Sequence, residues 1–363
     1  MSIFAFISKW GLVAYFLSSL IPLSKSDHWF IRVWDFPRLQ LLILGLLLGV
    51  TFMLITKEKN QVKIVILACF IVGISLDLYR VLPYSIIWKK ESVQTKAQNN
   101  IHSISILTVN VLQKNTTPSA LLQLIDKHSP DMVFLLEVNK RWISDVISLE
   151  KSYPHKLIRP LENTYGLALY SKLELEDAEI RELIEKDIPS VYAKAKLRSG
   201  ERIELYGLHP RPPHYESGDT TERDAELIQV AKSVSKAELP VIVMGDLNDV
   251  AWSHTTRLFR RISKLLDPRV GRGSYPTFPT YVPFLRFPLD YVFHSDHLTL
   301  VSIKRLNDVG SDHYPMFIEF NLTPEKKDEQ NAPPKKEGDE KEARKTIQRA
   351  NGKFQRQNTN TLR

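Results

Sequence analysis

Three long apolar runs dominate the N-terminal part of the chain, at about residues 3–23, 39–56 and 62–83. Each approaches the roughly 20 apolar residues that an α-helix needs to cross the hydrocarbon core of a bilayer. A signal peptide would account only for the first run, and a soluble bundle would need polar helix faces that these runs lack. The pattern therefore predicts a membrane anchor of three transmembrane helices over residues 1–88, followed by a polar linker at residues 89–100.

The charges that flank these runs bear on the orientation in the membrane. The loop at residues 57–63 is short and its basic residues are all lysines, which favours a cytoplasmic position under the positive-inside rule. Basic residues also flank the opposite ends of the runs, so the rule does not decide the orientation. The balance leans slightly to an integral protein of the cell (inner) membrane whose C-terminal part, after the three runs, faces outward. Cys69 is the only cysteine, which excludes an intrachain disulfide and leaves the redox compartment open.

Beyond the linker, short apolar segments alternate with amphipathic ones as far as residue 322. Strands are predicted at residues 101–109, 131–137, 165–171, 191–197, 202–208, 241–244, 289–293, 301–306 and 316–320. Helices are predicted at residues 119–128, 221–237 and 255–266. Many strands with interspersed helices predict one α/β domain over residues 101–322, with a two-layered sheet core and helices outside.

The last segment, residues 323–363, differs in composition from the rest of the chain. It is rich in Lys, Glu, Gln and Asn, contains a Pro-Pro pair and holds almost no large apolar side chain. Such a segment cannot bury enough apolar surface to offset the entropy of ordering it. The composition therefore predicts a disordered, charged tail.

The formal net charge of +8 is unevenly distributed. Residues 1–100 carry 11 basic and 5 acidic side chains, residues 323–363 carry 11 and 7, and residues 101–322 carry 27 and 29. A domain that binds nucleic acid through its phosphates should itself be basic. The charge therefore does not favour nucleic acid as a partner, although a local basic run at residues 257–272 fits either a binding patch or a solvated helix face.

An apolar strand within residues 239–248 ends at Gly245 and is followed directly by Asp246 and Asn248. Turn geometry alone enriches loops in Asp and Asn, so this feature gains weight only because polar residues follow other predicted strands too. The full set is Asn110, Glu137, His209, Asp246, Asn248, Asp290, Asp312 and His313. Its donor atoms are mostly oxygens, which suits a hard cation such as Mg²⁺ or Mn²⁺ better than structural zinc.

Five short motifs lie at these strand ends: Val109-Asn110, Leu136-Glu137, Gly245-Asp-Leu-Asn248, Leu289-Asp-Tyr291 and Gly310-Ser-Asp-His313. In this order they resemble the motifs of the endonuclease/exonuclease/phosphatase superfamily. The resemblance covers about residues 101–322 and leaves the apolar runs and the tail outside. It implies a four-layer α/β/β/α sandwich and a metal-dependent hydrolase that acts on phosphate ester bonds.

The resemblance also implies a metal site. Glu137 would ligate Mg²⁺ or Mn²⁺, with Asn110 and Asp312 as the other protein groups at the metal. The cation would neutralise charge on a phosphoryl oxygen and on the leaving group.

The same resemblance implies catalytic roles for the other five residues. Asp246 would orient or deprotonate the attacking water, and Asn248 would hold that water or a phosphate oxygen. His313 would pair with Asp290, which fixes the tautomer of the ring and favours its cationic form. His209 would donate to a phosphate oxygen.

Three functions are consistent with the sequence. The first is a membrane-anchored phosphoesterase that hydrolyses a phosphodiester or phosphomonoester. Its substrate could be a lipid-linked phosphate, because the aromatic loop at residues 278–287 would border the cleft and touch lipid. The alternative for this loop is that it packs in the core. The second is a membrane-anchored nuclease acting on DNA or RNA, and the third is a non-catalytic scaffold. The segment at residues 210–213 is not typical of nucleases, and its Arg211 fits either a phosphate ligand or a solvent-facing residue. The expected partners are a phosphate ester and, through the apolar runs, a lipid bilayer.

Overall fold

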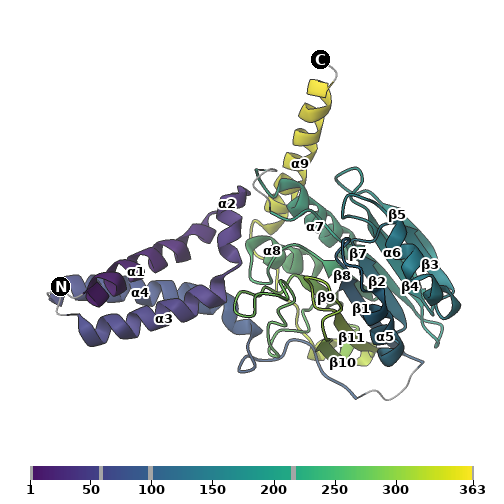
Figure 1. The fold of residues 1–363 in the computed structure, drawn as a ribbon, viewed down its shortest axis with the longest axis horizontal. Coiled ribbons are helices and arrows are strands. Elements are labelled where there is room, and N and C mark those ends of the chain that lie inside the picture. The colour runs from purple at the N-terminus through teal and green to yellow at the C-terminus, as the bar shows by residue number, and fades with distance from the viewer. Residues whose placement is uncertain (1–2, 57–59, 97–100, 214–217, 362–363) are drawn as a thin grey trace.

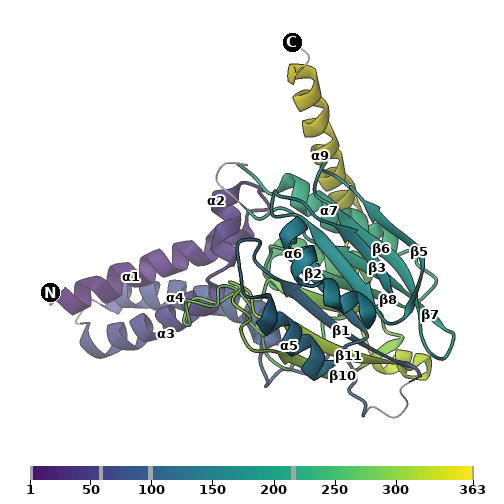
Figure 2. The same ribbon diagram turned by 45° about the vertical axis from the view of Figure 1, so that its right-hand side comes forward.

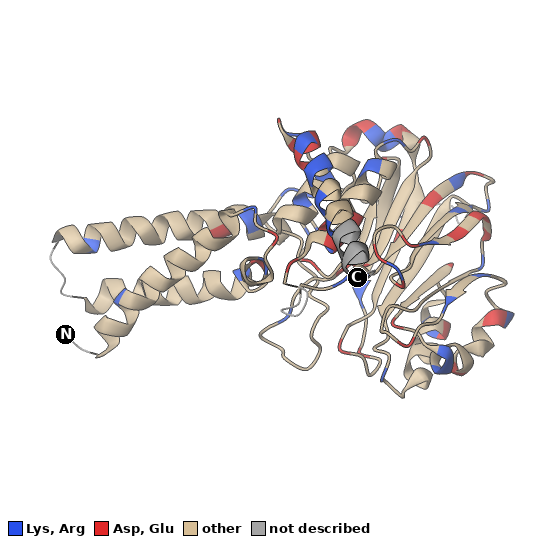
Figure 3. Cartoon of the chain, turned by 90° about the horizontal axis from the view of Figure 1, so that it is seen from above, with Lys and Arg blue, Asp and Glu red and all other residues tan. Residues whose placement is uncertain are grey.

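The computed structural model describes residues 3–56, 60–96, 101–213 and 218–361. A bundle of long helices projects from one side of a larger α/β domain, and the C-terminal helix leaves that domain in another direction (Figure 1). Figure 3 shows that the charged residues lie mostly on the α/β domain and the C-terminal helix, whereas the bundle carries very few. The apolar and charged parts of the sequence are therefore also separate in space.

The bundle consists of α1 (Ile3–Leu20), α3 (Arg38–Ile55) and α4 (Asn60–Val81). With their flanking turns, the spans Ile3–Leu23, Arg38–Ile55 and Gln61–Tyr84 are long and apolar enough to cross a membrane. Only a small apolar cluster is buried between these helices, and many of their large apolar side chains face outward. The three apolar helices therefore form as predicted, with bounds within a few residues of those expected.

Short elements connect the bundle to the domain. They are the 3₁₀ turns Ile21–Leu23, Val33–Asp35 and Leu82–Tyr84 and the short helix α2 (Trp29–Arg32). The indole N–H of Trp252 donates to the carbonyl of Asp35 at 2.6 Å, and the hydroxyl of Tyr84 donates to the carbonyl of Ala251 at 3.1 Å. Both connections to the bundle are thus hydrogen-bonded to the domain.

The α/β domain is built on two sheets. The first has the order β10-β11-β1-β2-β4-β3, with β1 at Ser103–Asn110, β2 at Met132–Leu136, β3 at His155–Arg159, β4 at Leu167–Ser171, β10 at Leu298–Arg305 and β11 at Met316–Leu322. The second has the order β5-β6-β7-β8-β9, with β5 at Glu174–Arg181, β6 at Ser190–Lys196, β7 at Arg202–Leu208, β8 at Val241–Asp246 and β9 at Asp290–His294. The neighbours β1 and β2, and likewise β7 and β8, run parallel.

The central strands are apolar on both faces because each sheet is covered twice. In β2, Phe134 and Leu136 belong to the cluster between the two sheets, whereas Val133 and Leu135 belong to the cluster on the outer face. That outer face is covered by α5 (Pro118–His128) and α6 (Lys140–Asp145), as Figure 2 shows. The outer face of the second sheet is covered by α7 (Thr221–Val234) and α8 (His254–Ser263). The predicted four-layer sandwich is confirmed.

Three elements of the domain were not recognised in the sequence. The strands β3 and β5 lie at the edges of their sheets, and many of their side chains are charged and exposed. Edge strands tolerate such residues and so lose the apolar alternation of inner strands. The short helix α6 depends on one local signal, because the Oδ1 atom of Asn139 caps it by accepting the N–H of Trp142.

The structure differs from the predicted disorder of residues 323–363. A 3₁₀ helix forms at Pro324–Glu329, followed after Gly338 by α9 (Asp339–Thr361). Ala343 joins the apolar cluster beneath α7 and α8, and Arg261 of α8 pairs with Asp339 at 2.7 Å. Small apolar side chains at helical spacing give α9 a buried face, which the polar composition of the segment concealed.

Candidate active site

The polar residues predicted from strand ends meet at one edge of the two sheets. Because β1 and β2 are parallel, and β7 and β8 are parallel, each pair ends on the same side. Asn110 is the last residue of β1 and Asp246 is the last of β8. Glu137 and His209 follow β2 and β7 directly. Contacts of β8 with β1 and β2 bring the two pairs of strand ends together.

Antiparallel strands deliver the remaining residues to the same edge. Asp290 opens β9 directly opposite Asp246, and His313 lies just before β11, which pairs antiparallel with β1. The hydroxyl of Ser311 donates to the carbonyl of Asn110 at 2.7 Å and accepts the N–H of His313 at 3.1 Å. This serine therefore fixes the loop that carries His313 to the end of β1.

A single cavity of about 320 Å³ connects these side chains. Seven of the eight predicted residues line it: Asn110, Glu137, His209, Asp246, Asn248, Asp312 and His313. The eighth, Asp290, lies behind the ring of His313. The cavity is within the size range of pockets that bind small molecules.

The backbone is unusual where it presents these residues. Gly245 has φ +132°, and a Cβ atom there would lie 2.0 Å from the carbonyl oxygen of Leu208 on the neighbouring strand. Only glycine permits this approach, which sets Asp246 at the end of its strand. Glu137 and Asn248 adopt φ values of 62° and 50°, a region that non-glycine residues rarely occupy. Such conformations concentrate at functional sites.

Two histidines lie on either side of Asp246. The Nδ1 atom of His313 is 2.8 Å from Oδ2 of Asp290, and its Nε2 atom is 3.5 Å from Oδ2 of Asp246. The Nε2 atom of His209 is 3.8 Å from the same Asp246 oxygen. The rings are also held by aromatic neighbours, with Phe278 4.8 Å from His313 and Tyr165 5.3 Å from His209 between ring centroids. All four polar side chains are almost completely buried.

The surroundings give the two histidines different charges. Burial opposes the charged form of His313, but the carboxylates of Asp290 and Asp246 outweigh it and raise its pKa to about 10. Burial lowers the pKa of His209, with a smaller contribution from the charge of His313, and the carboxylates of Asp246 and Asp290 do not reverse this. Burial also raises the pKa of Asp246, against the influence of His313. Near neutral pH the site therefore combines a cationic His313 with a neutral His209.

The donor set of the site fits a divalent cation near Glu137. Burial raises the pKa of this carboxyl group, and the charge of Asp312 raises it further. The Oε1 atom of Glu137 accepts the side-chain N–H of Asn110 at 2.9 Å, and Oε2 accepts the backbone N–H of Gln113 at 3.2 Å. A cation between the carboxylates of Glu137 and Asp312 would relieve their repulsion, and oxygen donors of this kind suit Mg²⁺ or Mn²⁺.

The two asparagines differ in how they face the site. Asn110 turns its Nδ2 atom towards Glu137 and also towards Asp246, at 3.3 Å, while its Oδ1 atom accepts the N–H of Leu112. In this arrangement the amide nitrogen of Asn110 holds two carboxylates in place, and the role of its oxygen as a metal ligand stays a prediction. Asn248 donates from Nδ2 to the carbonyl of Pro210 at 2.9 Å.

A second group of potential ligands consists of Asp246, Asp290 and His313, whose ligand atoms lie within 4.8 Å of one another. The 2.8 Å contact between Nδ1 of His313 and Oδ2 of Asp290 fits an acid–base pair, while the spacing of the three ligand atoms also fits a metal. Glu137 and Asp312 offer a second, oxygen-only position for a cation at the same cavity.

Several features of the cavity had no signal in the sequence. Tyr165 lines it beside His209, and Val33 and Phe36, from the segment between α1 and α3, line it as well. Arg211, by contrast, pairs with Glu185 at 2.7 Å. Three of the six basic residues in the run at residues 257–272 are paired with acidic side chains of the protein, as Arg260–Glu91, Arg261–Asp339 and Arg269–Asp267.

Comparisons with known proteins agree with this geometry. The profile described as "Endonuclease/Exonuclease/phosphatase family" matches residues 107–313. A search of curated protein sequences gave no significant match.

Among solved structures, a humanized D. rerio TDP2 has a TM-score of 0.51 at 19% identity, covering 61% of this chain and 99% of its own. D. rerio TDP2 complexed with a single-strand DNA product has a TM-score of 0.51 at 19% identity, and the match covers 60% of this chain and 99% of the TDP2 chain. The human Nocturnin catalytic domain with bound sulfate has a TM-score of 0.49 at 19% identity, and the match covers 64% of this chain and 98% of the Nocturnin chain. At these identities the two TDP2 structures support the fold alone. The profile match extends over more than half of the chain, which therefore belongs to the endonuclease/exonuclease/phosphatase family, whose members act on phosphate ester bonds.

Proposed function

We propose that this protein is a membrane-anchored, divalent-metal-dependent hydrolase whose phosphate ester substrate lies at the membrane surface. The observation that carries the proposal is the composition of the cavity. Carboxylates and histidines suited to phosphoester hydrolysis line it together with Val33 and Phe36, which belong to the segment that joins two of the three apolar helices. The site is thus built partly from the chain that would lie next to the bilayer.

Glu137 and Asp312 are the residues that would hold the cation. Bound there, Mg²⁺ or Mn²⁺ supplies charge neutralisation at a phosphoryl oxygen. Asn110 would keep the Glu137 carboxylate in position through the hydrogen bond to Oε1. This role explains why its amide nitrogen faces two carboxylates at once.

Asp246 is placed to orient the attacking water and accept its proton. Its Oδ1 atom accepts the backbone N–H of Asn248 at 2.9 Å, which leaves Oδ2 between the two histidines. The imidazolium of His313 would stabilise negative charge that grows on the phosphoryl group, and Asp290 would hold that ring in its cationic form. In the described part of the chain, the Nδ1 atom of His209 is buried without a hydrogen-bond partner, so a phosphate oxygen or a water is its natural acceptor.

The three apolar helices would make the protein an integral protein of the cell (inner) membrane, with the catalytic domain on the outer side. Single cysteines introduced into a Cys69→Ser background, at exposed domain positions such as Glu174, would test this orientation. Labelling of intact cells by an impermeant maleimide is the expected result. Labelling only after lysis would place the domain on the inner side.

The nuclease alternative is less well supported by the charges at the site. In the described part of the chain no Lys or Arg lines the cavity, although binding of an oligonucleotide relies on several phosphate contacts. A non-catalytic scaffold would have no need of the buried, mutually oriented His313, Asp290 and Asp246.

The full chain in lipid nanodiscs should be assayed with Mg²⁺ or Mn²⁺ against a phosphodiester, a phosphomonoester, a phospholipid and an oligonucleotide. We expect hydrolysis of an ester that is lost on chelation and strongly reduced in Glu137→Gln. Cleavage confined to the oligonucleotide would favour the nuclease. The absence of hydrolysis of every ester with either metal would contradict the proposed function.

A further inference from the structure

The segment that joins α1 to α3 forms one wall of the catalytic cavity. Its residues Val33 and Phe36 line the same cavity as Glu137, Asp246 and His313. Val33 is also 40% exposed, so this wall continues from the cavity to the outside of the protein. A residue of the anchor therefore lies within reach of whatever is attached to the reacting phosphate.

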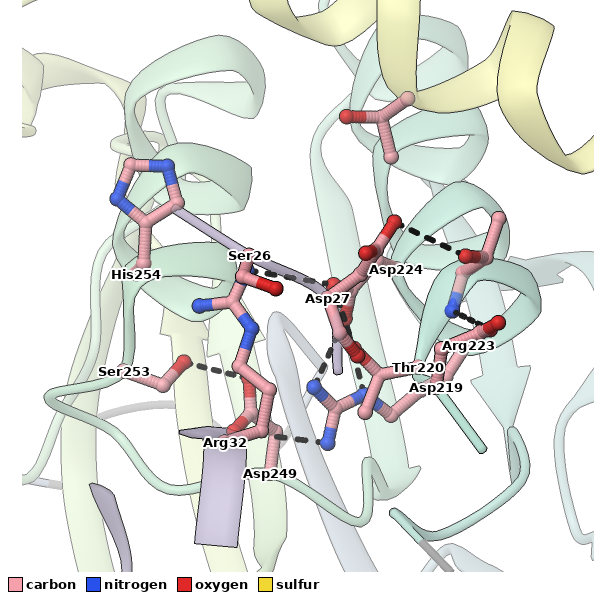
Figure 4. A network of polar contacts seen from close by, with 12 residues as sticks. Ser26, Asp27, Arg32, Asp219, Thr220, Arg223, Asp224, Asp249, Ser253 and His254 are labelled. Atoms are coloured by element: carbon pink, nitrogen blue, oxygen red, sulfur yellow. Dashed lines mark hydrogen bonds and ion pairs between the residues drawn. The ribbon is translucent and has the colours of Figure 1, made fainter. Parts of the chain in front are cut away.

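This wall is held in a fixed position. Figure 4 shows Asp27 and Arg32 of the anchor segment among polar side chains of the α/β domain. Arg32 lies 3.7 Å from Asp224 of α7, Asp224 pairs with Arg223 at 2.8 Å, and Arg223 donates to the carbonyl of Asn248 at 2.8 Å. A continuous chain of buried polar contacts thus links the anchor segment to a residue of the site.

The loop at residues 278–287 forms the opposite wall. At its base Phe278 lines the cavity and packs on His313. Phe287, at the other end of the loop, packs edge-on against Phe36 with 5.5 Å between ring centroids. Figure 2 shows the loop reaching from the domain alongside α3. Its tip is tied there, because the side-chain N–H of Gln40 donates to the carbonyl of Phe284 at 3.3 Å.

The tip of this loop is strongly apolar and exposed beside the bundle. Phe284 is 90% exposed and Tyr281 is 72% exposed. Large aromatic side chains at the mouth of a bundle of apolar helices are typical of residues that insert at the membrane interface. We name Val33, Phe36, Phe278 and Phe284 the apolar entrance. Three of these residues line the cavity, and Phe284 lies beside Gln40 in the first turn of α3.

We propose that the apolar entrance binds an apolar chain esterified to the reacting phosphate, so that the substrate is a membrane lipid that reaches the site directly from the bilayer. This inference rests on the proposed function. The cavity of about 320 Å³ accommodates a phosphate and the atoms next to it, while the rest of the apolar chain would lie along the exposed side chains of Val33 and Phe284. Because no Lys or Arg lines the described cavity, recognition would come from the apolar chain and the metal rather than from further charge on the headgroup.

Two substrates with the same leaving group test the entrance. They are p-nitrophenyl ethyl phosphate, which is free in water, and p-nitrophenyl hexadecyl phosphate, which partitions into the bilayer. Both release p-nitrophenol on hydrolysis by the full chain in nanodiscs. We expect kcat/KM for the hexadecyl ester to exceed that for the ethyl ester at least tenfold.

Phe284→Ser should lower the ratio of these two kcat/KM values about tenfold, and Val33→Ser should lower it in the same direction. Phe284 is exposed, so its replacement should leave the melting temperature unchanged. Ile147→Ser is the matched control, because Ile147 is 55% exposed on the helical layer that covers the first sheet, and it should leave the ratio as in the wild type.

The outcomes separate the two proposals. A wild-type enzyme that hydrolyses both esters with no chain preference, or a Phe284→Ser ratio equal to that of the wild type, overturns the apolar entrance and leaves the phosphoesterase function standing. Hydrolysis of neither ester, nor of any other phosphate ester, removes the proposed function and the inference with it.

Discussion

The pairing of His313 with Asp290 leads to a sharp prediction for a double-mutant cycle. The imidazole Nδ1 lies 2.8 Å from the Asp290 carboxylate, and both side chains are nearly fully buried. If both residues act through one ring, His313→Ala removes the effect of Asp290 as well. The single substitutions and the double substitution should therefore not be additive.

The expected size of the rate loss follows from the role of the His313 imidazolium. Charge stabilisation by a positioned acid–base group is worth on the order of 10²–10⁴-fold in rate, or about 3–5 kcal/mol. His313→Ala should lose this factor in kcat more than in KM, because the interaction strengthens in the transition state. Asp290→Asn should lose less, on the order of 10–10²-fold, because the amide oxygen can still accept the Nδ1 proton but cannot stabilise the charge.

The pH dependence gives a second readout of the same pair. In the wild type, Asp290 and Asp246 outweigh burial and hold the pKa of His313 at about 10, so His313 stays protonated from neutral pH to about pH 9. In Asp290→Asn one of the two carboxylates is gone, and the loss of kcat with rising pH should begin at a lower pH. Because the folded-state pKa of His313 is raised, the ring is charged at pH values below about 10 and loses its proton only above that. Any loss of kcat through deprotonation of His313 must therefore appear on the alkaline side of the pH profile.

The assay is steady-state hydrolysis of a chromogenic phosphodiester by the full chain at saturating Mg²⁺, between pH 6 and pH 9.5. Asp177→Asn, an equally conservative change at an exposed ion pair on β5, is the control and should behave as the wild type. A double mutant whose loss equals the product of the two single losses would refute the pairing. An unchanged alkaline limb in Asp290→Asn would refute it as well.

Three further predictions concern stability, each measured by thermal unfolding of the full chain in detergent. Burial, with a smaller contribution from Glu185, raises the pKa of Glu226 to about 8. The stabilising contribution of the protonated Glu226 should therefore be full below about pH 4.5 and fall as the pH rises towards 8, by about 1.4 kcal/mol for each pH unit. A Glu226→Gln variant that keeps this slope would show that another group is responsible. Gly245→Ala should lower the free energy of unfolding by roughly 3 kcal/mol or more, because its Cβ atom would lie 2.0 Å from a backbone oxygen. Gly200→Ala, where a Cβ atom would have nothing within 4 Å, should lower it by only about 1–2 kcal/mol. Equal losses would contradict the steric argument. Deleting residues 339–363 should lower the melting temperature by several degrees. The deletion uncovers the apolar cluster at Ala343 and leaves Arg261 without its partner Asp339. An unchanged melting temperature would show that α9 does not stabilise the domain.

The central strands and the residues at their ends could be predicted because their signals are local. An apolar run such as residues 241–244 followed by Gly245 and Asp246 specifies both a buried strand and what it presents at its end. Parallel pairing of β1 with β2 and of β7 with β8 then brings the ends together. The edge strands β3 and β5 lacked such a signal, since edge positions do not require apolar side chains.

The parts that sequence could not supply depend on contacts between distant segments. Nothing in the sequence near Val33 indicates that it lines the same cavity as Asp246, more than 200 positions away. The charge of residue 261 likewise gives no sign of its partner Asp339 in α9. The direction of the Asn110 amide group also depends on distant residues, because its nitrogen donates to Glu137 and Asp246.

The metal dependence of phosphate ester hydrolysis in Glu137→Gln tests the proposed chemistry most directly. Turnover by the full chain in nanodiscs should be titrated with Mg²⁺ and Mn²⁺ for the wild type, for Glu137→Gln and for Glu174→Gln, a control at an exposed ion pair of β5. We predict that Glu137→Gln raises the metal concentration for half-maximal turnover at least tenfold and lowers the maximal rate, while the control follows the wild type. Turnover of Glu137→Gln within a few-fold of the wild type at the same metal concentrations would contradict the assignment of the cation to this carboxylate.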